Sequence, residues 1–311
     1  MFALRKEIPA WQAAICAAAC VALFLGGWSY VTKGEIIEER IYPPYILPSP
    51  SETFAKLPAL WTKAHLAQNT YISLRRVVLG FSLAVLVGVP VGALCGCFSR
   101  INAFFTPITA FGRNVPMAAL IPLTFALFGS TSEKQKYMFI FLSCVAFVVS
   151  DTAGAIRDVG SQYVDTAFPL GANLRQVILK VVVPLALPSI FNSLRVLFGL
   201  AFGYIMLAEL VKTSDKEGGL GYIINLSQVR GSDRAYSNLI LLLIPIVALV
   251  IDRLLYLIQT QLFPYRYGGR GYLLRCVQAA LRGWEEIKRL FFTTASADAF
   301  PAPRSKSAPK K

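Results

Sequence analysis

The sequence predicts an all-α membrane protein with six transmembrane helices. Of its 311 residues, 55% are hydrophobic and only 15% are charged, and the mean hydropathy is +0.55. A soluble domain normally carries about 25% charged residues, so this chain has too little polar surface to cover itself and must expose apolar surface to lipid. The composition therefore argues against a disordered chain, a disulfide scaffold and an ordinary cytosolic enzyme.

Six apolar stretches approach the length of about 20 residues that crosses a hydrocarbon core. The first, over residues 8–32, follows Arg5 and Lys6 but is too long for the apolar part of a signal peptide, so we expect it to remain as a membrane helix. The other spans are expected over residues 77–99, 106–128, 136–155, 186–210 and 235–263.

The segment between the first two spans predicts a short helix on the membrane surface. Ser49 and Glu52 have the spacing of a capping box, and Pro50 stands at the first helical position. Apolar residues then follow at helical spacing, so residues 50–66 predict an interfacial amphipathic helix that is broken or kinked at Pro58. We expect it inside an extracytoplasmic loop over residues 34–69.

Small residues form ridges on two of the spans. Gly88, Gly92 and Gly96 recur at four-residue steps on the second span, and Gly199 and Gly203 do so on the fifth. Such ridges let neighbouring helices approach closely in lipid, so both predict tight helix packing.

A helical hairpin is predicted between the fourth and fifth spans. Pro169 and Gly171 separate two short helices, each with an apolar stripe at helical spacing. The apolar residues are Val164, Ala167 and Phe168 on the first helix, and Leu174, Val177, Ile178 and Val181 on the second. Such a hairpin suits a hydrophobic groove on another protein. Periodicity alone, however, favours an interfacial hairpin with no partner.

The same segment resembles the EAA loop of ABC importer permeases. Asp165-Thr166-Ala167 stands at the usual Glu-Ala-Ala position, Gly171 at the central glycine, and Pro184 and Pro188 at the closing prolines. Thr166 and Phe168 depart from the small apolar and basic residues that are common there. Other segments over residues 45–263 resemble the nitrate/sulfonate/taurine branch of that family: Leu47–Glu52, Thr70–Gly80 with Ser73 and Arg75, Arg113–Pro116, Ala119–Leu123 and Gly219–Tyr222.

This resemblance implies a type I ABC importer permease core over residues 70–263, with five spans and an EAA-type loop at about 155–185. It also implies a permease homodimer or heterodimer, two cytoplasmic ABC ATPase subunits and an extracytoplasmic substrate-binding protein. The hairpin would be the coupling helix region that docks on an ATPase. The residues expected to carry this coupling are Tyr163, Asp165, Thr166, Ala167, Gly171, Arg175 and Pro184.

Charged residues inside spans are costly and are therefore candidates for a translocation path. Arg195 and Glu209 lie 14 residues apart on the fifth span, roughly 21 Å along the axis and within about 40° of one face. Arg113 lies near the cytoplasmic end of the third span. Each of these residues could instead reach its own membrane interface, and Asp252 and Arg253 are expected to be structural.

A contact with the binding protein is expected from the loop over residues 212–236. Its Gly219 and Gly221, followed by Tyr222, would let the backbone approach a partner closely. Glycines also make ordinary turns, so this expectation depends on the family resemblance.

The sequence lacks the residues that catalysis or metal binding would need. His65 is the single histidine, and five of the six cysteines lie inside apolar runs as small packing residues. A metalloprotease needs a cluster of histidines, and a serine hydrolase finds no convincing base here. No Gly-Lys dipeptide occurs, so no P-loop is present. We expect no catalytic residue, metal or cofactor in this chain, and ATP hydrolysis in a partner subunit.

Half of the formal net charge of +14 lies in the last 48 residues, which carry a net charge of +7. Residues 264–311 predict a basic amphipathic helix on an anionic inner leaflet, followed by a disordered cytoplasmic tail from Thr293. No motif for nucleic acid accompanies this charge. The positive-inside rule places both termini in the cytoplasm, but the bias comes entirely from this tail, so charge alone leaves the orientation open.

The sequence thus predicts the permease subunit of an ABC importer for a small anion such as nitrate, a sulfonate or taurine, located in the cell (inner) membrane. Residues 1–33 would form its first span, ahead of the outer loop, the core and the tail. A permease for a neutral vitamin precursor or another small organic solute is the alternative, and a non-transporting membrane anchor is a weaker one. Much of the substrate selection would rest with the binding protein.

Overall fold

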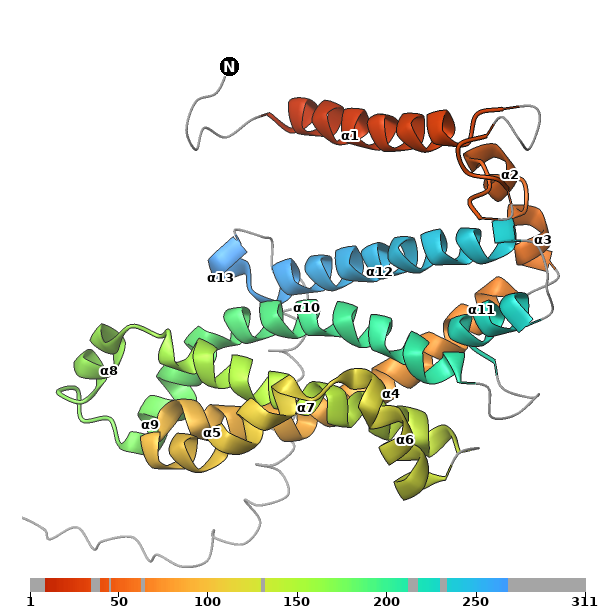
Figure 1. The fold of residues 1–311 in the computed structure, drawn as a ribbon. Helices are drawn as coiled ribbons and strands as arrows, with labels where there is room; N and C mark the ends of the chain where they lie inside the picture. The colour runs from red at the N-terminus through yellow and green to blue at the C-terminus, as the bar shows by residue number, and fades with distance from the viewer. Residues whose placement is uncertain are drawn as a thin grey trace, which may run out of the picture. The chain divides into compact units, whose positions relative to one another are not determined.

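The computed structural model of the chain describes residues 9–34, 40–44, 46–62, 65–129, 132–211, 218–229 and 234–267. In these segments every regular element is a helix (Figure 1), which confirms the all-α prediction. The chain divides into two compact units, residues 1–253 and 254–311. Of the predicted tail, only the short helix α13 (Pro264–Tyr267) lies within the described residues.

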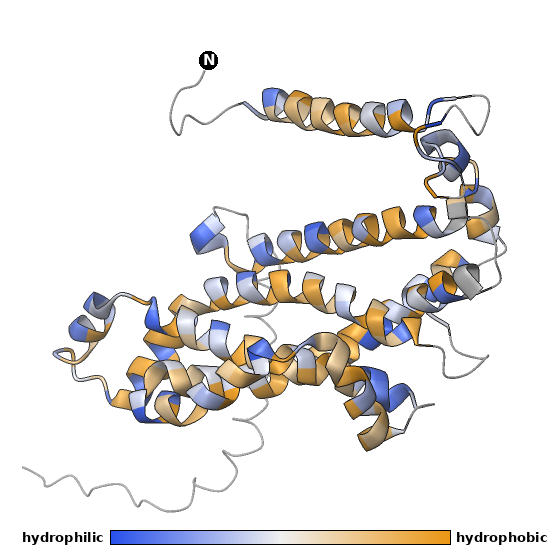
Figure 2. Ribbon diagram, viewed as in Figure 1, coloured by the Kyte–Doolittle hydropathy of each residue, from blue (hydrophilic) through white to orange (hydrophobic). Residues whose placement is uncertain are grey.

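Five runs of helix in the described segments are long and apolar enough to cross a membrane. Hydrophobic residues predominate along them (Figure 2). They are α1 (Ala10–Val31), α4 (Leu66–Cys97), α7 (Glu133–Arg157), α12 (Arg234–Leu262) and the continuous run of α9 (Leu174–Val177), a π-helical turn (Ile178–Val182) and α10 (Val183–Leu210).

The span predicted over residues 106–128 is not one continuous helix. The structure has two helices there, α5 (Ser99–Asn114) and α6 (Met117–Phe128), bent by 103° at the break between them. Val115 at the break is extended, with φ −67° and ψ 126°, because a residue before proline is disfavoured in the helical region and Pro116 follows it. Counting this pair as one broken span gives the six predicted spans.

The glycine ridge of α4 packs directly against α7, as predicted for the second span. A Cβ added at Gly92 would lie 2.6 Å from the Val149 carbonyl oxygen and 2.7 Å from Thr152 Cβ. Gly88 and Gly96 meet α7 side chains equally closely. The predicted ridge on α10 differs, because nothing lies within 4 Å of a Cβ added at Gly199 or Gly203.

The main hydrophobic core forms where α4, α7, α10 and α11 (Leu220–Val229) come together. Its fully buried large side chains include Val77 on α4, Phe139 and Ile140 on α7, Phe202 and Ile205 on α10, and Leu220 on α11. A charged group placed among these residues needs partners within the protein, because water is excluded there.

The capping box before the first short helix is confirmed. The Glu52 amide donates to the Ser49 hydroxyl at 3.3 Å, and the Ser49 amide donates to the Glu52 carboxylate at 2.8 Å. This amide, together with Arg40, holds the pKa of Glu52 below its usual value. The predicted helix over 50–66 is broken into α2 (Pro50–Phe54) and α3 (Leu57–Thr62), with the break before Leu57 rather than at Pro58.

We expect Gly92→Ala to destabilise the chain by about 1–3 kcal/mol, because the new methyl group clashes with backbone and side-chain atoms of α7. Gly154→Ala is the matched control, since nothing lies within 4 Å of a Cβ there. The measurement is the melting temperature of the detergent-solubilised chain. Equal melting temperatures for the two variants would contradict the close α4–α7 packing.

Candidate functional site

The predicted hairpin is present as α8 (Ser161–Ala167), a turn and α9, and it lies at the N-terminal end of α10, whereas α11 lies at the other end (Figure 1). Gly171 makes the turn, with φ +81°. Its amide donates to the Phe168 carbonyl at 2.9 Å, and the Ala172 amide donates to the Ala167 carbonyl at 3.2 Å. This is the Schellman pattern of helix ends, in which the left-handed position favours glycine.

The hairpin is anchored by one apolar face and leaves a second apolar face exposed. Val164, Ala167 and Val177 pack with Ile156 and Val182 in a separate small core. Large apolar side chains on the hairpin are nevertheless exposed: Tyr163 by 47%, Phe168 by 48%, Leu170 by 82% and Leu174 by 54%. An exposed apolar patch beside a span is the kind of surface that another protein covers.

The other residues predicted for coupling lie on or next to this hairpin. Asp165, Thr166 and Arg175 are exposed, and the Thr166 hydroxyl donates to the Gln162 carbonyl at 2.6 Å. Pro184 stands just after the π-helical turn at the start of α10. Because proline has no N–H to donate to the preceding turn, a local departure from the α-helix is physically expected there.

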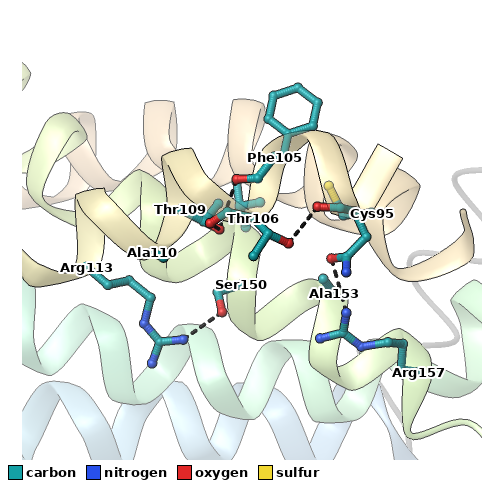
Figure 3. Close-up of a pocket in the computed structure, with 11 residues that line it drawn as sticks. Cys95, Phe105, Thr106, Thr109, Ala110, Arg113, Ser150, Ala153 and Arg157 are labelled. Atoms are coloured by element: carbon teal, nitrogen blue, oxygen red, sulfur yellow. Dashed lines mark hydrogen bonds between the residues drawn. The ribbon is translucent and has the colours of Figure 1, made fainter. Parts of the chain in front are cut away.

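Arg113 lies in the last turn of α5, beside α7. Its guanidinium donates to the Ser150 hydroxyl at 2.6 Å and lies over the Phe147 ring, 5.3 Å from its centroid. Arg157, at the end of α7, donates to the Asn102 side chain at 3.1 Å. Both arginines line a cavity of ≈ 290 Å³ between α5 and α7 (Figure 3).

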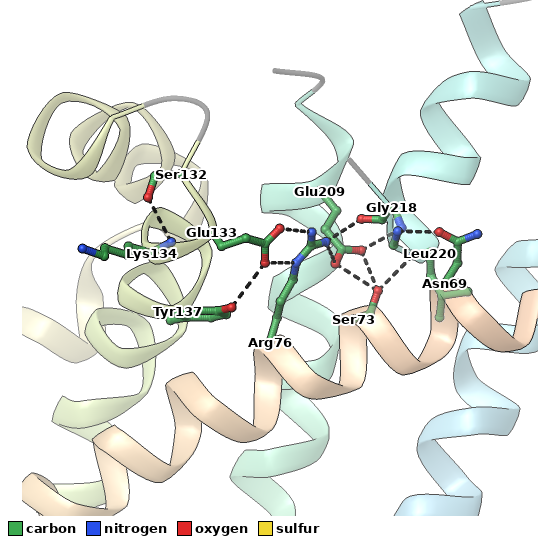
Figure 4. Close-up of polar contacts among 12 residues, drawn as sticks. Asn69, Ser73, Arg76, Ser132, Glu133, Lys134, Tyr137, Glu209, Gly218 and Leu220 are labelled. Carbon is green, nitrogen blue, oxygen red and sulfur yellow. Dashed lines mark hydrogen bonds and ion pairs between the residues drawn. The ribbon is translucent and has the colours of Figure 1, made fainter. Parts of the chain in front are cut away.

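A buried ion cluster joins the C-terminal end of α10 to three other helices (Figure 4). At its centre Arg76 of α4 has a side chain that is only 2% exposed. The guanidinium donates to Glu209 of α10 at 2.8 Å, to Glu133 of α7 at 2.9 Å through Nε, and to the Gly218 carbonyl at 2.5 Å. A second nitrogen of Arg76 also contacts Glu133.

The Glu209 carboxylate, whose side chain is fully buried, has further donors around it. The Ser73 hydroxyl lies 2.8 and 2.9 Å from its two oxygens, and the Gly221 amide donates at 3.1 Å. Ser73 also accepts from the Leu220 amide at 2.9 Å. Breaking such a pair would leave an uncompensated buried charge, so the cluster holds α4, α10 and the start of α11 in one arrangement.

The cluster also explains the glycines before α11. A Cβ at Gly219 would lie 2.4 Å from the Glu209 carboxyl carbon, and one at Gly221 would lie 2.7 Å from Glu209 Cβ. Both glycines are buried and Tyr222 is partly buried. The predicted 212–236 loop is also wrong in part, because α11 occupies Leu220–Val229. The contact with a binding protein that was expected of Gly219, Gly221 and Tyr222 stays a prediction.

The two charges expected along one face of the fifth span have separate partners. Glu209 belongs to the buried cluster, whereas Arg195 forms an ion pair with Asp252 of α12, with 2.9 Å between Nε and Oδ1. The Arg195 side chain is 17% exposed. The structure thus brings neither residue together with Arg113.

Comparison with known proteins identifies the family. Residues 88–264 match the family model described as the binding-protein-dependent transport system inner membrane component. The chain belongs to this family. The chain is therefore a permease subunit of an ABC importer, a multi-pass membrane protein and not itself an enzyme.

Curated relatives of this permease agree with the family assignment. The chain is 33% identical to the putative ABC transporter permease protein MJ0413 of Methanocaldococcus jannaschii, over 65% of this chain and 74% of the relative. It is 29% identical to the taurine transport system permease protein TauC of Escherichia coli, over 79% and 87% of the two chains. It is 30% identical to the nitrate import permease protein NrtB of Synechococcus elongatus, over 76% of this chain and 85% of the relative.

A solved structure agrees with the predicted fold. A chain of the MetNI methionine ABC transporter in an inward-facing conformation superposes with a TM-score of 0.57 at 21% identity. The match covers 65% of this chain and 97% of that chain. This confirms the type I importer permease fold that the sequence predicts.

Sequence reasoning missed Arg76 and Glu133. The resemblance pointed to Ser73 and Arg75 in the same stretch. In the structure Asn69, Ser73 and Arg76 share one face of α4, whereas Arg75 is exposed. Helical spacing from Ser73 would have selected Arg76 rather than its neighbour. Nothing in the sequence indicates that Glu133 lies opposite, because that contact joins residues 57 positions apart.

We expect Arg76→Met to destabilise the chain by about 3–5 kcal/mol, because it leaves Glu209 buried without its cation. Arg75→Met is the matched control, and as an exposed substitution it should stay within about 0.5 kcal/mol. Yield of monodisperse protein and the melting temperature measure both effects. If the two variants behave alike, the cluster does not stabilise the fold.

Proposed function

We propose that the chain forms the translocation path for a small anion such as nitrate, a sulfonate or taurine, driven by separate ATPase subunits. The observation that carries this proposal is the similarity to TauC and NrtB, which extends over more than three quarters of this chain in each case. Their names concern taurine and nitrate. Both substrates carry an oxyanionic group, so the shared chemistry is a small oxyanion.

The α8–α9 hairpin is proposed as the surface that docks on an ATPase subunit. Its exposed apolar face, with Leu170 as the most exposed member, supports this role. Burial of such side chains in a groove of a partner would give the association its driving force. The permease would act as a homodimer or heterodimer with two ATPase subunits and an extracytoplasmic binding protein.

This docking role sets the proposed orientation. The hairpin end of α10 would face the cytoplasm and the buried ion cluster would face the outside. With α5 and α6 counted as one crossing, both termini would then be cytoplasmic. The proposed division is a first span over 1–33, an outer loop over 34–69, the permease core over 70–263 and a cytoplasmic tail over 264–311.

We expect Leu170→Glu to weaken association with the ATPase subunit by about tenfold or more, the equivalent of roughly 1.4 kcal/mol. The side chain is 82% exposed, so the fold itself should keep its melting temperature. Gln162→Glu places the same charge on a polar, exposed position of α8 and is the control. Co-purification of the two subunits measures the effect, and unchanged co-purification of Leu170→Glu would exclude the hairpin as the docking surface.

Uptake in a strain that lacks this permease tests the proposed substrate class. Labelled nitrate, taurine and bicarbonate form the panel, and labelled thiamine serves as a substrate without an oxyanionic group. We expect uptake of one of the three anions only when the gene is restored. Restored uptake of thiamine alone would contradict an anion path, and loss of uptake on deleting residues 163–183 would support coupling through the hairpin.

A further inference from the structure

The cavity between α5 and α7 carries positive charge from Arg113 and Arg157. Its lining includes Asn102, Thr106, Thr109 and Arg113 from α5, and Ser150 and Arg157 from α7 (Figure 3). No carboxylate belongs to this lining. The volume of ≈ 290 Å³ lies at the lower end of known ligand pockets and suits a small solute.

The two arginines of the cavity have hydrogen-bond donors to spare. A guanidinium carries five N–H donors, and Arg113 uses one on Ser150 while Arg157 uses one on Asn102. Within the described residues neither forms an ion pair. Asp151, partly buried next to Ser150, interacts electrostatically with Arg113 but does not line the cavity.

The arrangement of these charges along the helices is also informative. Ser150, which binds Arg113, precedes Arg157 by seven residues on α7, a rise of about 10 Å. The cations therefore lie at two levels of the same wall, two turns apart. Arg113 lies in the last turn of α5, Arg157 is the last residue of α7, and both side chains are exposed. Charged residues on membrane helices are rare and are candidates for ion pathways.

The threonine hydroxyls of the cavity do not compete for the arginines. The Thr106 hydroxyl donates to the Asn102 carbonyl at 2.7 Å, and the Thr109 hydroxyl donates to the carbonyls of Phe105 and Thr106 at 3.1 Å each. These hydroxyls are satisfied by their own helix. The charged donors left for a ligand are the guanidinium groups, which match the two oxygens of a planar or tetrahedral oxyanion in a bidentate manner.

We propose that this cavity binds a small oxyanion, held by Arg113 and Arg157, within the permease itself. This site deepens the proposed function. It rests on that function, because only the proposed function makes the bound anion the transported solute. Selection by an external binding protein would then be followed by a second recognition of the negative charge by the permease. The phosphate of a lipid has the same chemistry, so the test must separate a free anion from a lipid headgroup.

Chemical labelling measures the charge of the cavity without any need for transport. Thr106→Cys, in a chain whose six native cysteines are replaced, places an accessible thiol in the cavity; Ala103→Cys, on the same helix but outside the lining, is the control. The chain is held in phosphatidylcholine nanodiscs. We expect the thiol at 106 to react roughly tenfold faster with a sulfonate-bearing methanethiosulfonate than with a trimethylammonium-bearing one, relative to the control.

Removing either cation should weaken this preference. Arg113→Gln and Arg157→Gln are each expected to lower the rate ratio at position 106 several-fold and to leave the ratio at position 103 unchanged, which also shows that the helix still folds. A ratio at 106 that equals the ratio at 103 in the unmodified background would overturn the anion site.

Protection then identifies the source of the anion. Nitrate, taurine or bicarbonate at millimolar concentration should slow labelling at 106 at least threefold, whereas glucose should not. Protection that appears only when phosphatidylglycerol replaces phosphatidylcholine would assign the arginines to a lipid headgroup and overturn the proposal. If the chain takes up an anion but that anion gives no protection at position 106, the proposed anion site is wrong and the proposed function stands. If an anion protects position 106 but the chain transports no anion, the proposed function is wrong and the anion site stands.

Discussion

The buried ion pair of Arg76 and Glu209 is the interaction on which the arrangement of the helices depends. Two charges withdrawn from water are tolerated only when their remaining donors and acceptors find partners. Here Ser73, Glu133 and the backbone around α11 supply them. Satisfying these groups requires α4, α7, α10 and α11 to meet in one geometry. Together with the glycine contacts of α4 on α7, the pair makes these helices one packed unit.

The run of α9 and α10 connects this cluster to the hairpin at its other end. It extends over 37 residues, from Leu174 to Leu210, and includes Glu209 near its end. A displacement of the hairpin by an ATPase would therefore be transmitted along a nearly continuous helix toward the cluster. The π-helical turn before Pro184 is the local departure from α-helical geometry in this run, and it is the natural place for bending.

The sequence predicted what depends on length, composition and local spacing. The spans, the capping box at Ser49 and the Gly171 turn all follow from such local rules. The break at Pro116 was missed, because apolar composition continues through it and hides a 103° bend. The buried role of Gly219 and the pairing of Arg76 with Glu133 and Glu209 were missed for another reason. These contacts join distant segments, and hydrophobic periodicity does not encode them.

A double-mutant cycle between Arg76 and Glu209 tests the central claim most directly. The free energy of unfolding of the full chain is measured in mixed micelles for Arg76→Met, Glu209→Gln, the double variant and the unmodified chain. If the pair holds the helices together, the double variant loses less stability than the two single losses combined, with a coupling energy above about 1.5 kcal/mol. Losses that add within about 0.5 kcal/mol would contradict the account.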